Sequence, residues 1–473
     1  MKSRIPQTIT LLSLGVAGAV GCAGQTGDEG PKSELATTAS ASEDARIQQI
    51  IDARYKKEDV RYSFRTRLGE DIDCIDFEAQ PSVKALRAQG IPVSNHAPPV
   101  PERFAKMGAK SAPVDPANDY SFNGSLDENG HARACSADTV PMLRVTADDI
   151  RRAGGVDEYQ RPHRKALPPH LAPGGCDVPG FAHVVGTLTP DTSAAVYGAG
   201  SIMSVHQPLL PANETEDHSL AQTWTYGGGN TSCSDPTGPS NLATLEVGWV
   251  VSPWVNNGDL APHLFTFSTI DGYWLTGCYN NDPTKIATYA AADGFSGSKC
   301  APYVEYGGAI YTPGQGVNVG SDLGANVWNF GNTALDWQLQ ITANGGESYY
   351  IGYWPSVPQT MTTFQAGGEV ADITDTMRVY PLQMGTGENP SLGYGLGESA
   401  VQHDFWAATA ANYIQSVAQF TIGETTPVDV SEDYTESTTL PGNSAWSNYF
   451  FYGGEIPFCV VNPTSPICHI RHF

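Results

Sequence analysis

The chain has 473 residues and a formal net charge of −24, yet only 16% of its residues are charged. Its 50 glycines and 34 prolines, with 10% aromatic residues, indicate a turn-rich, mainly β protein of two to three domains at about 150 residues each. Nucleic-acid binding is excluded because few basic side chains could neutralise phosphates, and a coiled coil because its compositional bias is missing. Disorder is excluded because the aromatic content can build a core.

The charge is divided unevenly along the chain. Residues 1–175 carry 22 of the 26 Lys and Arg residues and 23 of the 50 acidic residues, so this part is close to neutral. Residues 176–473 carry 27 acidic residues and only four basic ones, which gives this part a formal charge of −23. The four basic residues are Lys285, Lys299, Arg378 and Arg471. Two parts of such different charge predict two functional units.

The N-terminus has the pattern of an export signal. Lys2 and Arg4 precede an apolar run, Ile9 to Val20, that is too short to span a bilayer. The following Gly-Cys resembles a bacterial lipoprotein signal, so residues 1–21 are predicted to be removed and Cys22 to be lipidated, with ordinary secretion as the alternative. We expect an exported protein, extracellular or an outer-membrane lipoprotein of a bacterium, that meets a membrane only through this anchor.

Eight cysteines follow Cys22, and an even number in an exported protein predicts up to four disulfides. The candidates are Cys74, Cys135, Cys176, Cys233, Cys278, Cys300, Cys459 and Cys468. Cys278–Cys300 and Cys459–Cys468 are the local pairs. A zinc site that combines the last pair with His469 and His472 is a weaker alternative, since close cysteines in an exported tail are usually oxidised. No metal or other cofactor is expected.

The first part of the chain divides into three segments after the signal. Residues 22–43 are rich in Gly, Ser, Thr and Ala and predict a flexible tether. Residues 44–155 predict a compact, mixed α/β domain. Residues 156–178, rich in proline and basic residues, predict an exposed linker open to proteolysis.

A helix is predicted at the end of the tether. Ser40 and Glu43 have the spacing of a capping box, and the apolar residues after them recur at helical spacing. The residues on this predicted face are Ile47, Ile50, Ile51 and Tyr55.

Residues 179–473 show short runs of alternating hydrophobicity bounded by turn residues. This pattern predicts an antiparallel β-sandwich of the jelly-roll kind. The predicted strands are Phe181–Leu188, Leu220–Tyr226, Leu242–Val251, Leu264–Thr269, Gly272–Tyr279, Asn326–Phe330, Trp337–Ile341 and Tyr349–Trp354.

Two carboxylates stand out in this second part. Alternation places Glu246 on the same strand face as Gly248, and Glu369 directly follows Gly367 and Gly368. We interpret these glycines as open space beside each carboxylate, although each glutamate alone is more simply a solvent-facing strand residue. If the two met, they would share a proton: the ionised one could activate water while the neutral one donates a proton.

The order of motifs resembles the neprosin family of glutamic peptidases. The Leu-Glu-Val-Gly-Trp-Val-Val-Ser-Pro around Glu246 and the Gly-Gly-Glu-Val around Glu369 are similar to its two catalytic motifs. Ile72–Asp76 and Cys135–Arg144 resemble its activation peptide, so the resemblance extends over about residues 65 to 460.

This resemblance implies a zymogen whose pro-domain inhibits a β-sandwich peptidase. Glu246 and Glu369 would be the catalytic pair, acting on protein or peptide substrates, after proline, at acidic pH. Which of them is the base stays open. A non-catalytic, lectin-like sandwich that binds a surface ligand through aromatic residues is the other function considered.

Four further residues are candidates for binding the substrate or the oxyanion. Gln222, which shares a strand face with Trp224, could donate to a tetrahedral oxyanion, with a surface amide as an equal alternative. Tyr353 and Trp354 could line a pocket for proline, and core packing is the more usual role of such aromatics.

The charge division leads to a prediction about acid tolerance. Residues 176–473 contain four Lys and Arg and seven His residues, so they cannot build a large positive charge in acid, whereas their negative charge is fully developed at neutral pH. We expect the melting temperature of this part to hold or rise from pH 7 to pH 4. A steady fall over that range, measured by a thermal melt, would contradict the prediction.

Overall fold

The computed structural model describes residues 32–100, 135–164, 181–188, 195–210, 217–228, 241–288, 299–330, 336–343, 348–357, 360–371, 382–387, 399–409, 413–414, 421–425, 434–437 and 449–455. The described residues from 45 onward form one compact unit. Cys22, Cys176, Cys233, Cys459 and Cys468 lie outside the described residues.

Helix α1 (Lys32–Arg54) begins earlier than the sequence predicted, since the proposed capping box at Ser40 lies inside it. Pro31 precedes the helix and no Gly or Pro interrupts it, so nothing in the sequence stops it from extending toward the N-terminus. The predicted apolar face is confirmed, because Ile47 and Ile50 are buried.

The region before residue 165 builds a small α/β fold. Its three-stranded antiparallel sheet consists of β1 (Val60–Arg65), β2 (Asp71–Asp76) and β3 (Thr139–Leu143). Its short helices are η1 (Lys57–Asp59), η2 (Phe77–Ala79), α2 (Pro81–Ala88), α4 (Ala147–Arg152) and α5 (Val156–Tyr159).

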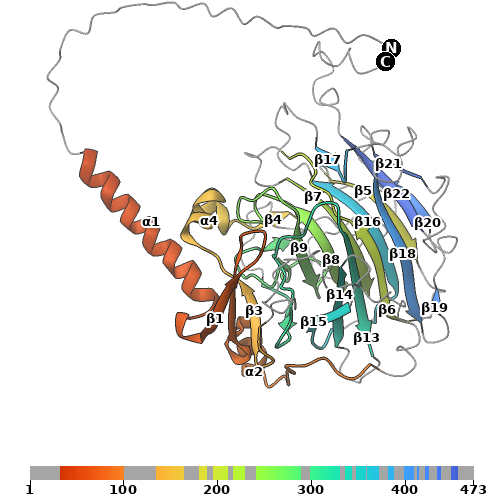
Figure 1. Ribbon diagram of the computed structural model, residues 1–473, viewed down its shortest axis with the longest axis horizontal. Coiled ribbons are helices and arrows are strands. Elements are labelled where there is room, and N and C mark those ends of the chain that lie inside the picture. Colours follow the sequence, from red (N-terminus) through yellow and green to blue (C-terminus); the bar gives the residue numbers. More distant parts are fainter. Residues whose placement is uncertain are drawn as a thin grey trace, which may run out of the picture. The chain divides into compact units, whose positions relative to one another are not determined.

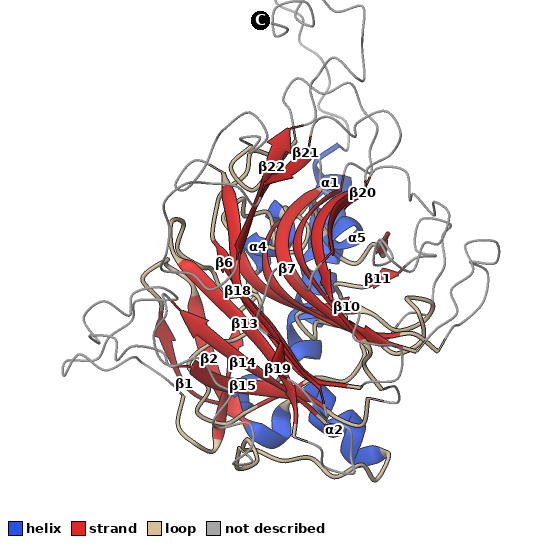
Figure 2. Cartoon of the chain, turned by 90° about the vertical axis from the view of Figure 1, so that its right-hand side faces the viewer, coloured by secondary structure: helices blue, strands red, loops and turns tan. Residues whose placement is uncertain are grey.

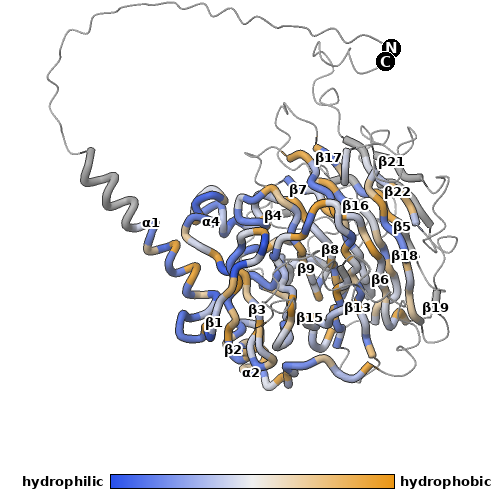
Figure 3. Tube along the Cα trace, viewed as in Figure 1, coloured by the Kyte–Doolittle hydropathy of each residue, from blue (hydrophilic) through white to orange (hydrophobic). Residues whose placement is uncertain are grey.

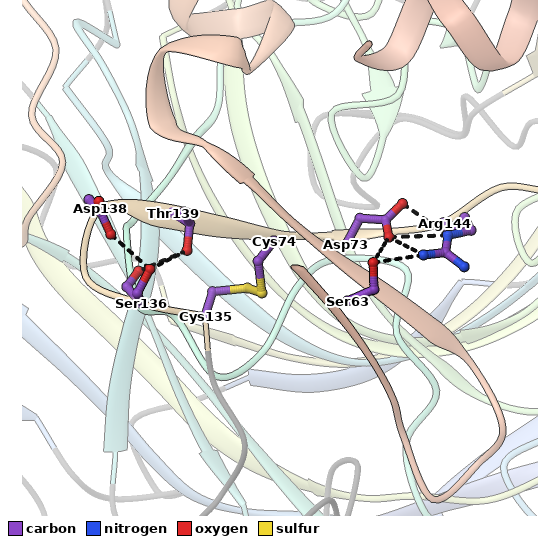
Figure 4. Close-up of a disulfide and its surroundings, with 8 residues drawn as sticks. All are labelled: Ser63, Asp73, Cys74, Cys135, Ser136, Asp138, Thr139 and Arg144. Carbon is purple, nitrogen blue, oxygen red and sulfur yellow. Dashed lines mark hydrogen bonds and ion pairs between the residues drawn. A yellow bond between two sulfur atoms is a disulfide. The ribbon is translucent and has the colours of Figure 1, made fainter. Parts of the chain in front are cut away.

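A disulfide and an ion pair fasten this small fold (Figure 4). Cys74 on β2 is bonded to Cys135, just before β3. Asp73 accepts hydrogen bonds from Arg144 and Ser63. Burial opposes ionisation of Asp73, but these bonds prevail and hold its pKa below the ordinary value.

The rest of the chain forms two large antiparallel sheets (Figures 1 and 2). The seven-stranded sheet has the order β10 (Cys278–Tyr279), β9 (His263–Thr269), β8 (Ala243–Val251), β7 (His218–Gly227), β16 (Thr363–Ala371), β5 (Phe181–Leu188) and β20 (Thr421–Thr425). The path of the ten-stranded sheet is β12 (Val304–Glu305), β15 (Ser348–Trp354), β14 (Trp337–Ala343), β13 (Asp322–Asn329), β6 (Val196–Ser204), β18 (Ala400–Thr409), β22 (Tyr449–Glu455) and β17 (Gln383–Met384), with β19 (Tyr413–Ile414) and β21 (Tyr434–Ser437) beside it.

The main core lies between the two sheets, so the predicted β-sandwich is confirmed. Val247 and Trp249 of β8 and Val327 and Leu339 of the ten-stranded sheet belong to one buried cluster. The predicted alternation along β8 is therefore right, with every second residue facing this core. Figure 3 shows hydrophobic and hydrophilic residues interleaved along the strands.

Seven of the eight predicted strands are present with boundaries close to those expected, and Gly272–Tyr279 is the exception. Most of this segment is a turn, and only Cys278–Tyr279 pairs as β10. The Asp271 carboxylate accepts hydrogen bonds from the backbone N–H groups of Trp274, Leu275 and Thr276. This side chain competes with strand pairing, as aspartates in turns commonly do. The predicted Cys278–Cys300 disulfide follows the turn and is confirmed.

The predicted exposed linker begins later than residue 156. Val156 and Tyr159 are buried in α5, and β4 (His163–Arg164) pairs in parallel with β11 (Ala287–Thr288). Apolar side chains within a Pro-rich, basic stretch produce this order. Among the described residues, no helix is both long enough and apolar enough to cross a membrane.

Candidate active site

Glu246 and Glu369 lie on the same face of the seven-stranded sheet, on the two strands that pair with β7. Trp224 is opposite Glu246 in the β7–β8 register, and Leu220 is opposite Glu369 in the β7–β16 register. Directly opposite residues of antiparallel strands share a face, as do residues an even number apart on one strand. Both carboxylates therefore project from the face opposite the main core. Gln222 projects from the same face of β7, midway between Leu220 and Trp224.

Glu369 has donors on both of its carboxylate oxygens. His218 Nε2 lies 2.7 Å from Oε1, and His183 Nε2 lies 3.0 Å from Oε2. The Gln222 side-chain amide donates to Oε2 at 3.2 Å. Glu369 itself is 0% exposed. Such a set of donors favours the ionised form of a buried carboxyl group.

Glu246 has a different environment, built from hydroxyl groups. The Tyr273 hydroxyl donates to Oε1 at 2.5 Å, and the Thr244 hydroxyl lies 3.2 Å from the same oxygen. Burial, and then the nearby Glu246 carboxylate, raise the pKa of Tyr273 well above its usual value. Tyr273 therefore remains a proton donor in hydrogen bonds throughout the physiological range.

Apolar and aromatic side chains surround the pair. Trp224, Leu220 and Tyr273 belong to a second buried cluster on this outer face of the sheet. The Trp224 and His183 rings are 5.4 Å apart. Burial in such surroundings strengthens every electrostatic interaction of the two carboxylates.

Gln222 and Trp224 thus lie with the carboxylates, as their sequence positions suggested. Tyr353 and Trp354 do not lie on this face, because β15 belongs to the other sheet. Trp354 is part of the core between the sheets, and the Tyr353 ring stacks on Tyr306. Tyr353 also packs against the region before residue 165, where its hydroxyl accepts a hydrogen bond from the Ser94 N–H.

Sequence reasoning missed His183, His218 and Tyr273. The period of two along His218–Gly227 would have placed His218 on the face of Gln222. No sequence signal pairs His183 with Glu369, because that contact depends on the β5–β16 register. Tyr273 was predicted to lie in a strand. It lies instead in the turn that begins at Asp271, and this turn brings its hydroxyl into contact with the Glu246 carboxylate. In the described part of the chain, no group of three or more His, Cys, Asp or Glu residues is arranged to hold a metal ion.

The profile of the neprosin family matches residues 215–455 of this chain. The chain is also similar to a crystal structure of scytalido-glutamic peptidase with a peptide-based transition state analog, with 8% identity and a TM-score of 0.30, over 59% of this chain and 98% of that one. A further similar structure is SCP-B, a member of the eqolisin family of peptidases, in a complex with the tripeptide Ala-Ile-His, with 8% identity and a TM-score of 0.29 over the same shares of both chains.

The glycines beside the carboxylates have a different role from the one expected. A Cβ at Gly248 would collide with the Ala221 carbonyl, and one at Gly367 with the Val184 carbonyl. A Cβ at Gly368 would meet the Tyr452 ring. These glycines therefore permit close strand packing rather than leave open space for a ligand.

We expect Gly367→Ala to destabilise the fold by about 1–3 kcal/mol, because the neighbouring strand must move to admit the methyl group. Chemical denaturation measures the change. The exposed Val319→Ala is the control and should alter stability by less than about 0.5 kcal/mol. Equal midpoints for the two variants would contradict this account of the glycine.

Proposed function

This chain belongs to the neprosin family of glutamic peptidases, and we propose that it hydrolyses peptide bonds after proline, at acidic pH, with Glu246 and Glu369 as the catalytic pair. The observation that carries the proposal is the placement of both carboxylates on one buried sheet face. No described feature of this face favours the lectin-like alternative. The specificity for proline rests on the family resemblance.

The donors divide the roles between the two glutamates. Glu369, which accepts from three nitrogen donors, is the ionised base and takes a proton from the attacking water. Glu246, in its protonated form, transfers its proton to the substrate carbonyl oxygen as that oxygen gains charge, and takes it back when the carbonyl re-forms. The proton held by Glu369 then passes to the leaving amine. The acidic medium, like the specificity for proline, is an expectation from the family resemblance.

We further propose that the chain is made as a zymogen. Glu246 and Glu369 are both 0% exposed, so a substrate can reach them only after a covering segment moves. The region before residue 165 ends beside this face. The His163 ring stacks on Trp254, with 3.8 Å between the ring centres, and the backbone N–H of His163 donates to the Ile286 carbonyl.

Polar contacts fasten this region to the sandwich at several further places. Arg54 forms a buried ion pair with Asp282, and the Lys285 ammonium lies 3.5 Å from the centre of the Tyr159 ring. At β12, the terminal strand of the described ten-stranded sheet, the Gln80 amide bonds both the N–H and the carbonyl of Glu305. These contacts support the assignment of residues 44–155 as a pro-domain that inhibits the enzyme, extended to residue 164.

The processing and export of the chain are also proposals. Cleavage between residues 165 and 178 would separate the pro-domain from the sandwich. The signal at residues 1–21 and lipidation at Cys22 would place the protein outside the cell or on a bacterial outer membrane. Mass spectrometry of the secreted or membrane-bound protein would identify both N-termini.

The catalytic assignment predicts the activity of two isosteric variants. After removal of the pro-domain, we expect Glu246→Gln and Glu369→Gln each to lose at least about 100-fold in kcat/KM on proline-containing peptides, since neither amide can exchange the required proton. The assay covers pH 3 to 7, with melting temperatures to confirm folding. Equal activity in the wild type and both variants, or an inactive processed wild type, would rule out the peptidase proposal.

The zymogen proposal predicts release of the pro-domain in acid. Burial, with Lys285, Arg161 and His218 nearby, lowers the pKa of His163 well below 6.5. The released form binds a proton more readily, so docking is favoured above about pH 6.5 and weakens as pH falls toward the lower, docked pKa. His163→Phe keeps an aromatic ring but cannot titrate, and should shift release to lower pH.

Release can be followed by size-exclusion chromatography from pH 8 to pH 4. The chain is cut at an engineered protease site between residues 165 and 178, and carries Glu369→Gln to prevent self-cleavage. The control is His96→Phe, at an exposed histidine of the same region. Identical release curves for the His163 and His96 variants would contradict the role of His163.

A further inference from the structure

We infer that His183 and His218 are positioning residues that hold Glu369 as an oriented carboxylate in acid and so extend the activity of the enzyme to lower pH. This inference rests on the proposed function, because it concerns the base of that reaction. It adds two histidines to a mechanism that otherwise needs only the glutamates and an amide.

The two histidines reach Glu369 from the strands on either side. His183 on β5 is directly opposite Glu369 in the β5–β16 register. His218 on β7 is opposite Ala371, two residues further along β16. Each imidazole contacts a different carboxylate oxygen, at 3.0 Å and 2.7 Å. With both oxygens bound, the plane of the carboxylate is fixed from two directions.

The histidines are enclosed almost as fully as the carboxylate. His183 and His218 are each 5% exposed. A contact between a carboxylate and an imidazole in such a site gains more from charge than the same contact in water. Two of them on one carboxylate form a built arrangement rather than a chance surface pair.

The chemistry of this arrangement changes as the medium becomes acidic. An isolated buried carboxylate takes up a proton as pH falls, because burial disfavours its charge. Each imidazole N–H donates a hydrogen bond to Glu369, and protonation of Glu369 would weaken both bonds. The two donors therefore favour the ionised form of the proposed base.

Other titratable groups face the same site. From β8 comes Glu246, and Tyr273, which has an electrostatic interaction with Glu369, comes from the turn after β9. From the region before residue 165, His163 interacts electrostatically with His218.

The test is the pH dependence of kcat/KM for the processed enzyme on a proline-containing peptide. His183→Phe and His218→Phe remove the donor and the charge but keep a ring, and we expect the acidic midpoint of the profile to rise by about one pH unit in each. His183→Gln and His218→Gln keep an uncharged N–H donor and should give smaller rises. His206→Gln is the matched control, because His206 bonds Ser204 on the other sheet, and its profile should not move.

A second measurement does not depend on activity. The imidazoles of His183 and His218 are titrated by NMR in the inactive Glu369→Gln variant and in the parent chain. By reciprocity, loss of the carboxylate should lower both midpoints. This measurement decides the question if a phenylalanine variant fails to fold.

The outcomes separate the two proposals. An unchanged acidic midpoint in folded phenylalanine variants, or unchanged imidazole midpoints, overturns the role of the histidines and leaves the peptidase proposal standing. A processed wild type without activity, or an active Glu369→Gln variant, overturns the peptidase proposal itself. The NMR result then still reports whether the histidines and Glu369 are coupled.

Discussion

The side-chain period of two along β7, β8 and β16 is the constraint on which the whole site depends. It sends Val247 and Trp249 into the core between the sheets and Glu246 to the opposite face. A slip of one residue in the pairing of β8 would exchange these two sets. The apolar core and the face that carries the two glutamates are therefore specified by the same register, and packing of the one enforces placement of the other.

The second condition for the site is that two buried acids have partners. Burying an ionised carboxylate without donors costs several kcal/mol, and a site with two of them would not be stable. Here nitrogen donors serve Glu369 and hydroxyl donors serve Glu246. This difference in partners, more than the position of either glutamate, supports the proposed roles of Glu369 as base and Glu246 as acid.

Much of the fold could be predicted from the sequence, because alternation and turn residues are local signals. The strands around Glu246 and the face on which it lies were predicted correctly from alternation alone. The register between strands is not local, so the contacts of His183 with Glu369 and the position of β15 in the other sheet could not be found in this way. The glycines beside Glu246 and Glu369 drew attention to the correct residues, but they were interpreted wrongly as open space. The sequence shows that a side chain is missing, but not that a neighbouring strand lies too close to admit one.

The contact between Gln80 and Glu305 has a consequence for the processed protein. A glutamine side chain here satisfies backbone groups of β12 that would otherwise form the bare edge of a sheet. Bare edges invite strand addition by other chains, and natural proteins commonly protect them with charge. Burial raises the pKa of Glu305 to about 8, so this carboxyl group is largely uncharged at neutral pH while the region is docked. Departure of the region would remove the Gln80 side chain and leave these backbone groups of β12 open to strand addition by another chain.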